Sequence, residues 1–117
     1  MRDLNEREKY VLDRMLREDF QGRNEVAEQI RNAQVEGIDE NGSVAFRVTS
    51  AVTADVRYAV PVEASADDSD GISIHFLLHV RDGRVHELEI YKDDGSPIRR
   101  WPPVDNLELF APPFKWE

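Results

Sequence analysis

The sequence predicts an α+β protein in which two N-terminal helices pack on a mostly antiparallel sheet of four to five strands. Apolar residues recur at helical spacing through the first third of the chain and then at every second position, which is typical of strands. Two turn signals, Asn41-Gly42 and Asp82-Gly83, join alternating segments and favour antiparallel hairpins.

The 117 residues suffice for one domain with a modest core. No linker, repeat or low-complexity tract divides the chain. We therefore expect a single domain with three parts. They are a helical part over residues 1–36, an antiparallel sheet over residues 37–100, and a tail rich in proline and aromatic residues over residues 101–117.

The first helix is predicted to begin after Asn5, because Asn5 and Glu8 have the spacing of a capping box. An apolar stripe follows, with charged residues opposite, and it consists of Val11, Leu12, Met15, Leu16 and Phe20. Gly22 ends this segment. A second, shorter helix is predicted from Asn24 over EVAEQIRNAQ, where small apolar residues indicate close packing.

Three segments then alternate in the manner of strands. Val44, Phe46 and Val48 follow the first turn signal. Residues 55–64 alternate next, and Pro61, which has no amide hydrogen, predicts that this strand lies at an edge or contains a bulge. Residues 72–80, ISIHFLLHV, have the strongest strand pattern, with isoleucine, phenylalanine, leucine and valine on one face.

The strand after the second turn signal poses a problem of register. An even hairpin places Glu87 and Glu89 on the core face, where unpaired carboxylates are costly. One extra residue near His86 turns Leu88 and Ile90 inward instead. We therefore predict a β-bulge at His86-Glu87, with an even hairpin covered on both faces as the alternative.

The tail contains two Pro-Pro pairs and four large aromatic residues, Trp101, Phe110, Phe114 and Trp116. Proline excludes a regular helix there. Residues 106–110, NLELF, are predicted to add a short edge strand. We expect the aromatic side chains to pack over the sheet, and a dimer interface is the alternative.

Composition excludes several classes of function. Lys and Arg total 15 while Asp and Glu total 24, so the net charge of −9 repels phosphate backbones and no nucleic-acid partner is expected. Because the chain has no cysteine, disulfides, thiolate metal sites and a cysteine nucleophile are excluded. No apolar run approaches the roughly 20 residues of a membrane span, and the N-terminus has no signal-peptide core. We expect no membrane partner and a cytoplasmic location.

The histidines His75, His79 and His86 are the candidate nitrogen ligands for a metal. Strand pairing brings His79 opposite or diagonal to His86, and Glu87 or Glu89 adds an oxygen ligand, which is a zinc-like set. No metal-binding sequence motif accompanies these residues, so we expect no metal and no other cofactor.

The sequence contains no other complete motif for metal binding, nucleotide binding or catalysis. Neither Gly71 nor Gly95 has oxygen ligands at the positions that a calcium loop requires. The serines lack a G-x-S-x-G context, and no glycine-rich nucleotide motif occurs. Glu87 and Glu89 have a spacing that suits acid–base chemistry, but outward carboxylates on a strand are common. We therefore assign no catalytic residue.

The remaining candidate is a surface for a protein partner. Its residues lie on or after the last strand of the hairpin, and they are Glu87, Glu89, Tyr91, Asp93, Asp94 and Trp101. Asp67, Asp68 and Asp70 of the preceding acidic turn extend this surface if the strands bring them to the same side. A basic protein is the expected partner, because opposite fields steer encounter.

The stretches IDENGSVAFRV and VPVEASADDSDGISIHFLLHVRDGRVHELEIYKDDGSPI resemble a family of small stand-alone bacterial proteins of unknown function. The resemblance extends from LNEREKYVLDRML to SPIRRWP, and LLHVRDGRVHELEIYKDDGSPI is its most specific part. The end of that part is also similar, over a shorter length, to immunity proteins that neutralise polymorphic toxins. The resemblance implies a bacterial source, a single compact domain and no assigned enzymatic activity.

These observations predict a non-enzymatic acidic protein-binding module, with an immunity-type inhibitor of a basic partner as its specific form. One alternative is a small metal-dependent or hydrolytic enzyme that uses His79 and His86 with Glu87 or Glu89. Another is a structural homodimer formed through a sheet edge or the tail aromatics.

Overall fold

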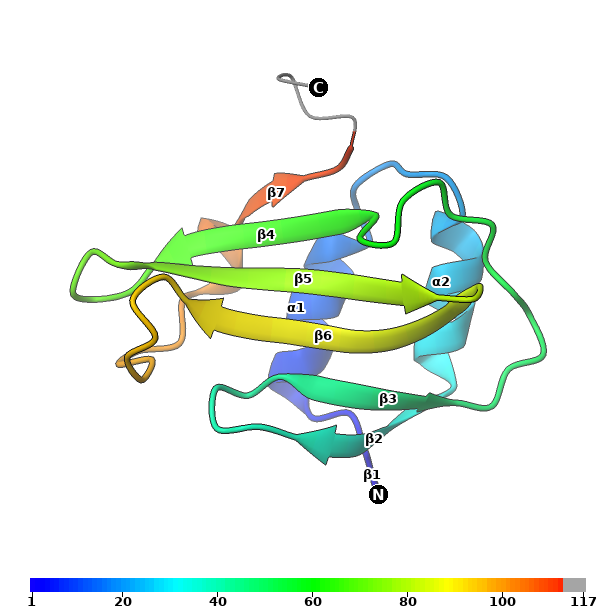
Figure 1. The fold of residues 1–117 in the computed structure, drawn as a ribbon, viewed down its shortest axis with the longest axis horizontal. Helices are drawn as coiled ribbons and strands as arrows, with labels where there is room; N and C mark the ends of the chain where they lie inside the picture. The colour runs from blue at the N-terminus through cyan, green and yellow to red at the C-terminus, as the bar shows by residue number, and fades with distance from the viewer. Residues whose placement is uncertain (113–117) are drawn as a thin grey trace.

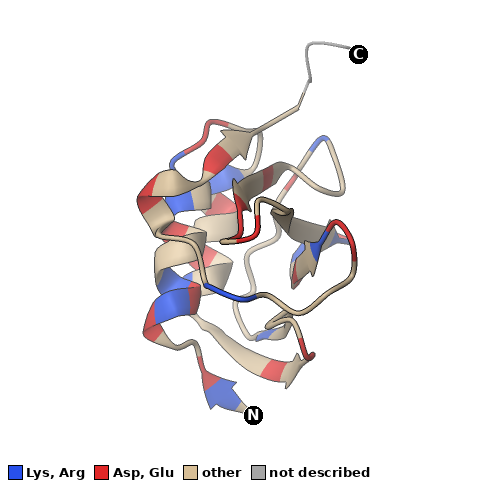
Figure 2. Cartoon of the chain, turned by 90° about the vertical axis from the view of Figure 1, so that its left-hand side faces the viewer, with Lys and Arg blue, Asp and Glu red and all other residues tan. Residues whose placement is uncertain are grey.

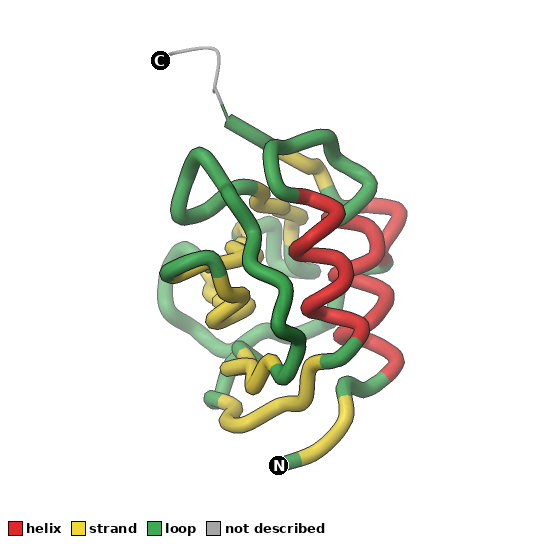
Figure 3. The backbone as a smooth tube through the Cα atoms, turned by 90° about the vertical axis from the view of Figure 1, so that its right-hand side faces the viewer, coloured by secondary structure: helices red, strands yellow, loops and turns green. Residues whose placement is uncertain are grey.

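A computed structural model describes residues 1–112 of the chain and shows an α+β fold in two layers (Figures 1 and 3). Two helices, α1 (Glu6–Met15) and α2 (Arg23–Arg31), cover one face of a seven-stranded antiparallel sheet. The predicted fold class is confirmed, whereas the predicted number of strands is too low.

The sheet consists of β1 (Arg2–Asp3), β2 (Ala33–Ile38), β3 (Val44–Val48), β4 (Val62–Asp67), β5 (Ser73–Arg81), β6 (Arg84–Lys92) and β7 (Glu108–Phe110). Their spatial order is β1-β2-β3-β6-β5-β4-β7, and every neighbouring pair is antiparallel. The part predicted to be helical therefore also contains β1 and most of β2. Both were hard to detect, because β1 has two residues and β2 is interrupted by a register shift between Val35 and Gly37.

The capping box of α1 is confirmed. The Asn5 side chain accepts a hydrogen bond from the Glu8 amide at 2.8 Å, and the Glu8 carboxylate accepts one from the Asn5 amide at 2.9 Å. The same carboxylate forms two 2.8 Å hydrogen bonds with Arg2 of β1, which ties the first strand to the helix. Burial acts to raise the pKa of Glu8, but Arg2 and the Asn5 amide hold it below its usual value.

The helices are shorter than their apolar patterns suggested. α1 ends at Met15, and Phe20 packs against the core from the loop that follows. Gly22 is the residue before α2, with φ +88°, and a Cβ there would lie 3.0 Å from a methyl group of Val56. Only glycine meets both constraints, and the chain can therefore turn into α2 at this point.

The core lies between the helices and the central strands (Figure 3). α1 buries its apolar stripe against β4, and α2 contacts β6. The largest fully buried apolar side chains come from both layers, and they are Phe76, Leu12, Met15, Ile74, Leu78, Leu88 and Ile90. The alternation predicted for residues 72–80 thus faces the core as expected.

The predicted β-bulge is present in the β5–β6 hairpin. Val80 pairs with Val85 and His79 pairs with Glu87, so His86 is the extra residue. Leu88 and Ile90 consequently face inward, with 1% and 2% of their surfaces exposed. The register conflict in the sequence therefore identified both the position and the effect of the bulge.

The predicted strand over residues 55–64 is wrong in its first half. β4 begins only at Val62, directly after Pro61, which has no N–H to give to a sheet. Residues 49–61 instead form a crossover that carries the chain past the end of the β5–β6 hairpin to the far side of β5 (Figure 1). Ala59 closes this loop by accepting a 2.8 Å hydrogen bond from the Val80 amide.

The tail strand is confirmed as β7, which pairs with β4 after a short 3-10 helix, η1 (Val104–Asn106). Trp101 packs edge-on against Phe76, with ring centroids 5.5 Å apart, as the packing interpretation predicts. Phe114 and Trp116 lie outside the described residues. No helix within residues 1–112 is long and apolar enough to cross a membrane.

Candidate partner-binding face

The helices leave one face of the sheet uncovered, and Figure 1 looks directly onto it. We call its central part, over β4, β5 and β6, the open face. Its outward-pointing residues alternate with the core residues of the same strands, and they are Glu63, Ser65, His75, Leu77, His79, Glu87, Glu89 and Tyr91.

Carboxylates surround a small apolar centre on the open face. Glu63 and Glu89 lie on either side of Leu77 in one row across the strands. Tyr91 lies in the next row, opposite His75, and is 37% exposed. Burial of the phenol raises the pKa of Tyr91, and the charges of nearby Asp93, Glu89 and Glu63 raise it further. The phenol therefore remains a protonated hydrogen-bond donor at neutral pH.

Two histidines are held on this face by carboxylates. His75 Nε2 lies 2.6 Å from Asp93 Oδ1, and the His75 ring stacks on Tyr91 with centroids 4.8 Å apart. His79 Nε2 lies 2.9 Å from Glu89 Oε1. All these side chains are only partly buried, so the open face is ordered by its own contacts yet accessible to a partner.

The candidate metal ligands do not converge. His79 is opposite Glu87 and binds Glu89, whereas His86 is the bulged residue of β6. Within the described part of the chain, no group of three or more His, Asp or Glu side chains is arranged to hold a metal ion.

Ser65, His75 and Asp93 follow one another across β4, β5 and the end of β6, in the order of a catalytic triad. The histidine–aspartate contact is present. No hydrogen bond joins the Ser65 hydroxyl to His75 among the described residues.

The acidic turn between β4 and β5 does not extend the open face. Lys92, the last residue of β6, is buried and its ammonium binds Asp68 at 2.9 Å and Asp70 at 2.6 Å. Neither the Lys92 nor the Asp68 side chain has any exposed surface. Asp68 also accepts three backbone hydrogen bonds, from the amides of Ser69, Arg99 and Arg100. Asp68 and Asp70 therefore do not join the acidic surface, whereas Asp67, the last residue of β4, is exposed on the same face as Glu63 and Ser65.

Both charges of this buried pair are stabilised in the ionised form. Burial acts to raise the pKa of Asp68, but hydrogen bonds from the Arg99 amide and the Lys92 ammonium hold it well below its usual range. Burial acts to lower the pKa of Lys92, but Asp70 and Asp68 raise it above its usual value. Lys92 is therefore a structural cation and not a nucleophile at neutral pH.

The candidate partner-binding residues divide between the two sides of the sheet. Glu87, Glu89 and Tyr91 belong to the open face, and Asp93 adjoins it through His75. Asp94 is exposed in the following turn, where its carboxylate accepts two hydrogen bonds from Ser96. Trp101 lies on the helix side, between Phe76 and the guanidinium of Arg7, and is therefore not part of this surface.

Sequence reasoning missed Glu63 and Leu77 as neighbours of these residues. Glu63 lies on β4, far from β6 in the chain, and joins Glu89 only because β5 lies between the two strands. The signal available was the alternation of residues 62–67, where Glu63 and Ser65 fall on the polar face. The sequence pattern did not reveal that β5 lies between β4 and β6, and this strand order is what brings Glu63 and Glu89 to the same row.

Fold and site together define an α+β protein with one helix-covered sheet face and one open, acidic sheet face. The chain matches the model of a domain of unknown function (DUF6984) over residues 1–102, and it belongs to that family. No curated protein and no solved structure matches the chain.

Proposed function

We propose that this protein is a non-enzymatic protein-binding module that binds a basic partner protein through its open face. We further propose that it acts as an immunity-type inhibitor, which masks the basic surface of its partner. The observation that supports the proposal is the ring of carboxylates around an apolar centre, with Glu63, Glu87, Glu89 and Asp93 near Leu77 and Tyr91.

Charge and composition of the open face fit such a partner. The arginines of β5 and β6, Arg81 and Arg84, lie beside the turn of the hairpin, and Lys92 is buried, so carboxylates dominate the centre. An exposed tyrosine with partly buried aliphatic surface is typical of interface centres. A net charge of −9 accelerates encounter with a cationic protein.

The helix-covered side is a weaker candidate for the same partner. Figure 2 shows that Lys and Arg are interleaved with Asp and Glu along the helices. Such mixed charge maintains solubility without attracting one sign of partner. The open face is therefore the surface on which we place the proposed interface.

The test compares three affinity columns that carry the wild-type protein, the double variant E87Q/E89Q and the control variant E36Q/E40Q. Both variants lose two negative charges, but Glu36 and Glu40 are exposed residues on or just after β2, which two strands, β3 and β6, separate from β5. A lysate of the native host is applied at low salt and eluted with sodium chloride. We expect the wild-type and control columns to retain a common basic protein that the E87Q/E89Q column does not retain.

The salt dependence of binding completes this test. Association of the purified partner is expected to slow steeply as ionic strength rises, because screening removes the attraction between the two surfaces. Equal loss of binding in both double variants would show that only net charge matters. A salt-independent rate, or a partner with an acidic surface, would contradict the proposal.

A further inference from the structure

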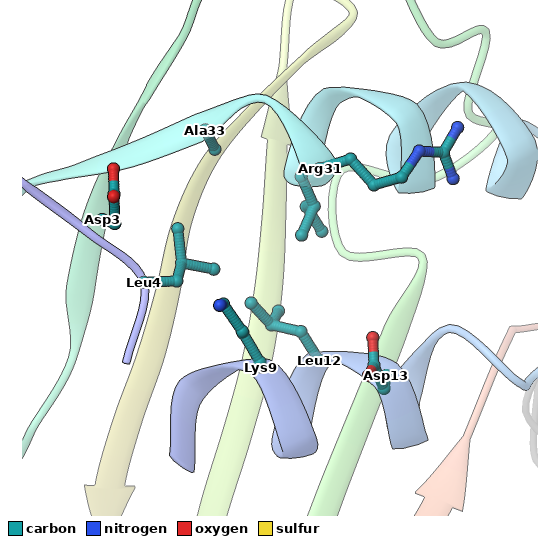
Figure 4. A pocket seen from close by; sticks show the side chains of 8 residues that line it. Asp3, Leu4, Lys9, Leu12, Asp13, Arg31 and Ala33 are labelled. Atoms are coloured by element: carbon teal, nitrogen blue, oxygen red, sulfur yellow. The ribbon is translucent and has the colours of Figure 1, made fainter. Parts of the chain in front are cut away.

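A pocket lies on the helix side of the sheet, opposite to the open face. α1 packs toward β4 and α2 toward β6, so the helices rest on different strands. The pocket lies between them and the β1–β2 edge, with a volume of about 440 Å³ (Figure 4). That volume is within the range of about 300–1,000 Å³ found for small-molecule sites.

The floor of this pocket is apolar and well packed. It is formed by Leu4, Leu12, Ile30 and Ala33, which come from the loop before α1, from α1, from α2 and from β2. Leu12 is completely buried, and Leu4 and Ala33 are each 8% exposed. Because four segments of the chain fix the floor, it is present before any ligand binds.

The rim carries charges of both signs. Lys9 and Asp13 are one helical turn apart on α1, and both side chains rise from the helix along the pocket in Figure 4. Lys9 has one weak ion pair, with the exposed Glu6 at 3.8 Å. Asp13 takes part in no ion pair or hydrogen bond within residues 1–112.

Asp3 and Arg31 complete the rim. Asp3 accepts a 3.2 Å hydrogen bond from Gln34, and the Arg31 side chain extends away from Lys9 and Asp13 in Figure 4. Lys9 and Asp13 are therefore the cation and the anion that lie together above the aliphatic floor.

We propose that this pocket binds a small zwitterion with aliphatic side chains and the size of a dipeptide, whose carboxylate lies at Lys9 and whose ammonium lies at Asp13. Side chains four residues apart on a helix have Cβ atoms about 6 Å apart. An extended dipeptide spans about 7 Å, which matches that spacing. Two leucine-sized side chains cover the floor, and the inference stands independently of the partner proposed for the open face.

The experiment titrates the ¹⁵N-labelled protein with leucyl-leucine and follows its backbone amide signals by NMR. N-acetyl-leucyl-leucine lacks the ammonium, and leucyl-leucinamide lacks the carboxylate. We expect saturable shifts at Leu4, Leu12, Ile30 and Ala33 with the parent dipeptide. Each analogue should bind about fivefold more weakly, the effect of one partly exposed ion pair.

Three variants test which charged group of the dipeptide each pocket residue binds. D13N should bind leucyl-leucine and its N-acetyl analogue equally, and K9Q should bind leucyl-leucine and its amide equally. R17Q removes an exposed cation just after α1, outside the pocket, and should behave as the wild type. Dispersed spectra of all variants verify that each is folded.

Several results would overturn the inference. They are shifts that do not saturate, shifts confined to other parts of the chain, and equal affinity of the wild type for all three compounds. Loss of discrimination in R17Q equal to that in K9Q would also overturn it, because a nonspecific charge effect would then explain the data.

Discussion

Lys92 shows how a single side chain joins distant segments of this chain. Its ammonium binds two carboxylates of the turn between β4 and β5, and the carbonyl of Pro97 lies 3.4 Å away. Asp68 binds the amides of Arg99 and Arg100 on its other side. The segment that leads from β6 to the tail is therefore held to the β4–β5 turn by ionised groups, of which Lys92 and Asp68 have no exposed side-chain surface.

The pH dependence of stability follows from the directions of these pKa shifts. The pKa of Asp68 is lower in the folded protein than its usual value of 3.8. Its contribution is therefore fully present above about pH 4 and is lost as the pH falls further. The pKa of Lys92 is raised above 10.5, so its contribution is present below that pH and is lost in stronger alkali.

We predict that D68N lowers the free energy of unfolding at pH 7 and flattens its decline below pH 4, because the titrating carboxylate is gone. Urea denaturation at a series of pH values measures both effects. D67N is the matched control, since Asp67 is exposed. An acid profile of D68N parallel to that of the wild type would contradict the prediction.

At the scale of elements, the β5–β6 hairpin depends on a helix for its hydrogen bonds. Gln29 of α2 is completely buried and donates to the carbonyls of Val52, at 2.9 Å, and Gly83, at 2.8 Å. Its side-chain oxygen accepts a 2.8 Å hydrogen bond from the Val85 amide. One amide side chain thus connects α2, the crossover loop and the hairpin turn.

We predict that Q29L destabilises the protein by about 2–4 kcal/mol, because the buried Val85 amide loses its acceptor and the partly buried carbonyls of Val52 and Gly83 each lose a donor. Q34L is the control, since Gln34 is exposed on β2, and its effect should stay within about 0.5 kcal/mol. Chemical denaturation of both variants gives the comparison. Equal stability of Q29L and Q34L would refute the role assigned to Gln29.

The β-bulge at His86 leads to a separate prediction about single-residue deletions in β6. Deleting His86 restores even pairing and leaves Leu88 opposite Leu78, so the variant should remain folded with a modest loss of stability. Deleting Glu89 instead turns Ile90 outward and Lys92 away from its carboxylates, so that variant should unfold. NMR contacts between Leu78 and Leu88 distinguish the two cases. Unfolding of the His86 deletion would contradict the assigned register.

In the molecule as a whole, the number of paired residues differs greatly from one pair of neighbouring strands to another. β3 and β6 share only two residue pairs, Val44 with Leu88 and Ala45 with Glu87. Ser43 strengthens this junction, since its hydroxyl accepts a hydrogen bond from the Ile90 amide at 2.6 Å and lies 3.1 Å from the Ile90 carbonyl. The junction between β3 and β6 therefore depends on two ladder pairs and on the hydroxyl of Ser43.

Trp101 covers part of that core from the tail, between Phe76 and Arg7. Its indole N–H is buried and has no hydrogen-bond partner among the described residues. We predict that W101A costs about 3 kcal/mol, whereas W101F costs about 1 kcal/mol or less because it keeps the aromatic contact and removes the unpaired donor. Urea denaturation tests this order. Equal destabilisation by the two substitutions would disprove it.

The order of the residues was sufficient to predict the α+β class and three local features, namely the capping box at Asn5, the turn at Asp82-Gly83 and the bulge at His86. Each depends on periodicity or register within a short segment, which neighbouring residues fix. The strand order that places Glu63 beside Leu77, and the burial of Lys92 against Asp68, 24 residues earlier, became visible only in the folded chain. The sequence of a turn does not show whether its aspartates face water or a buried cation, because the cation comes from a distant segment that only the fold brings close.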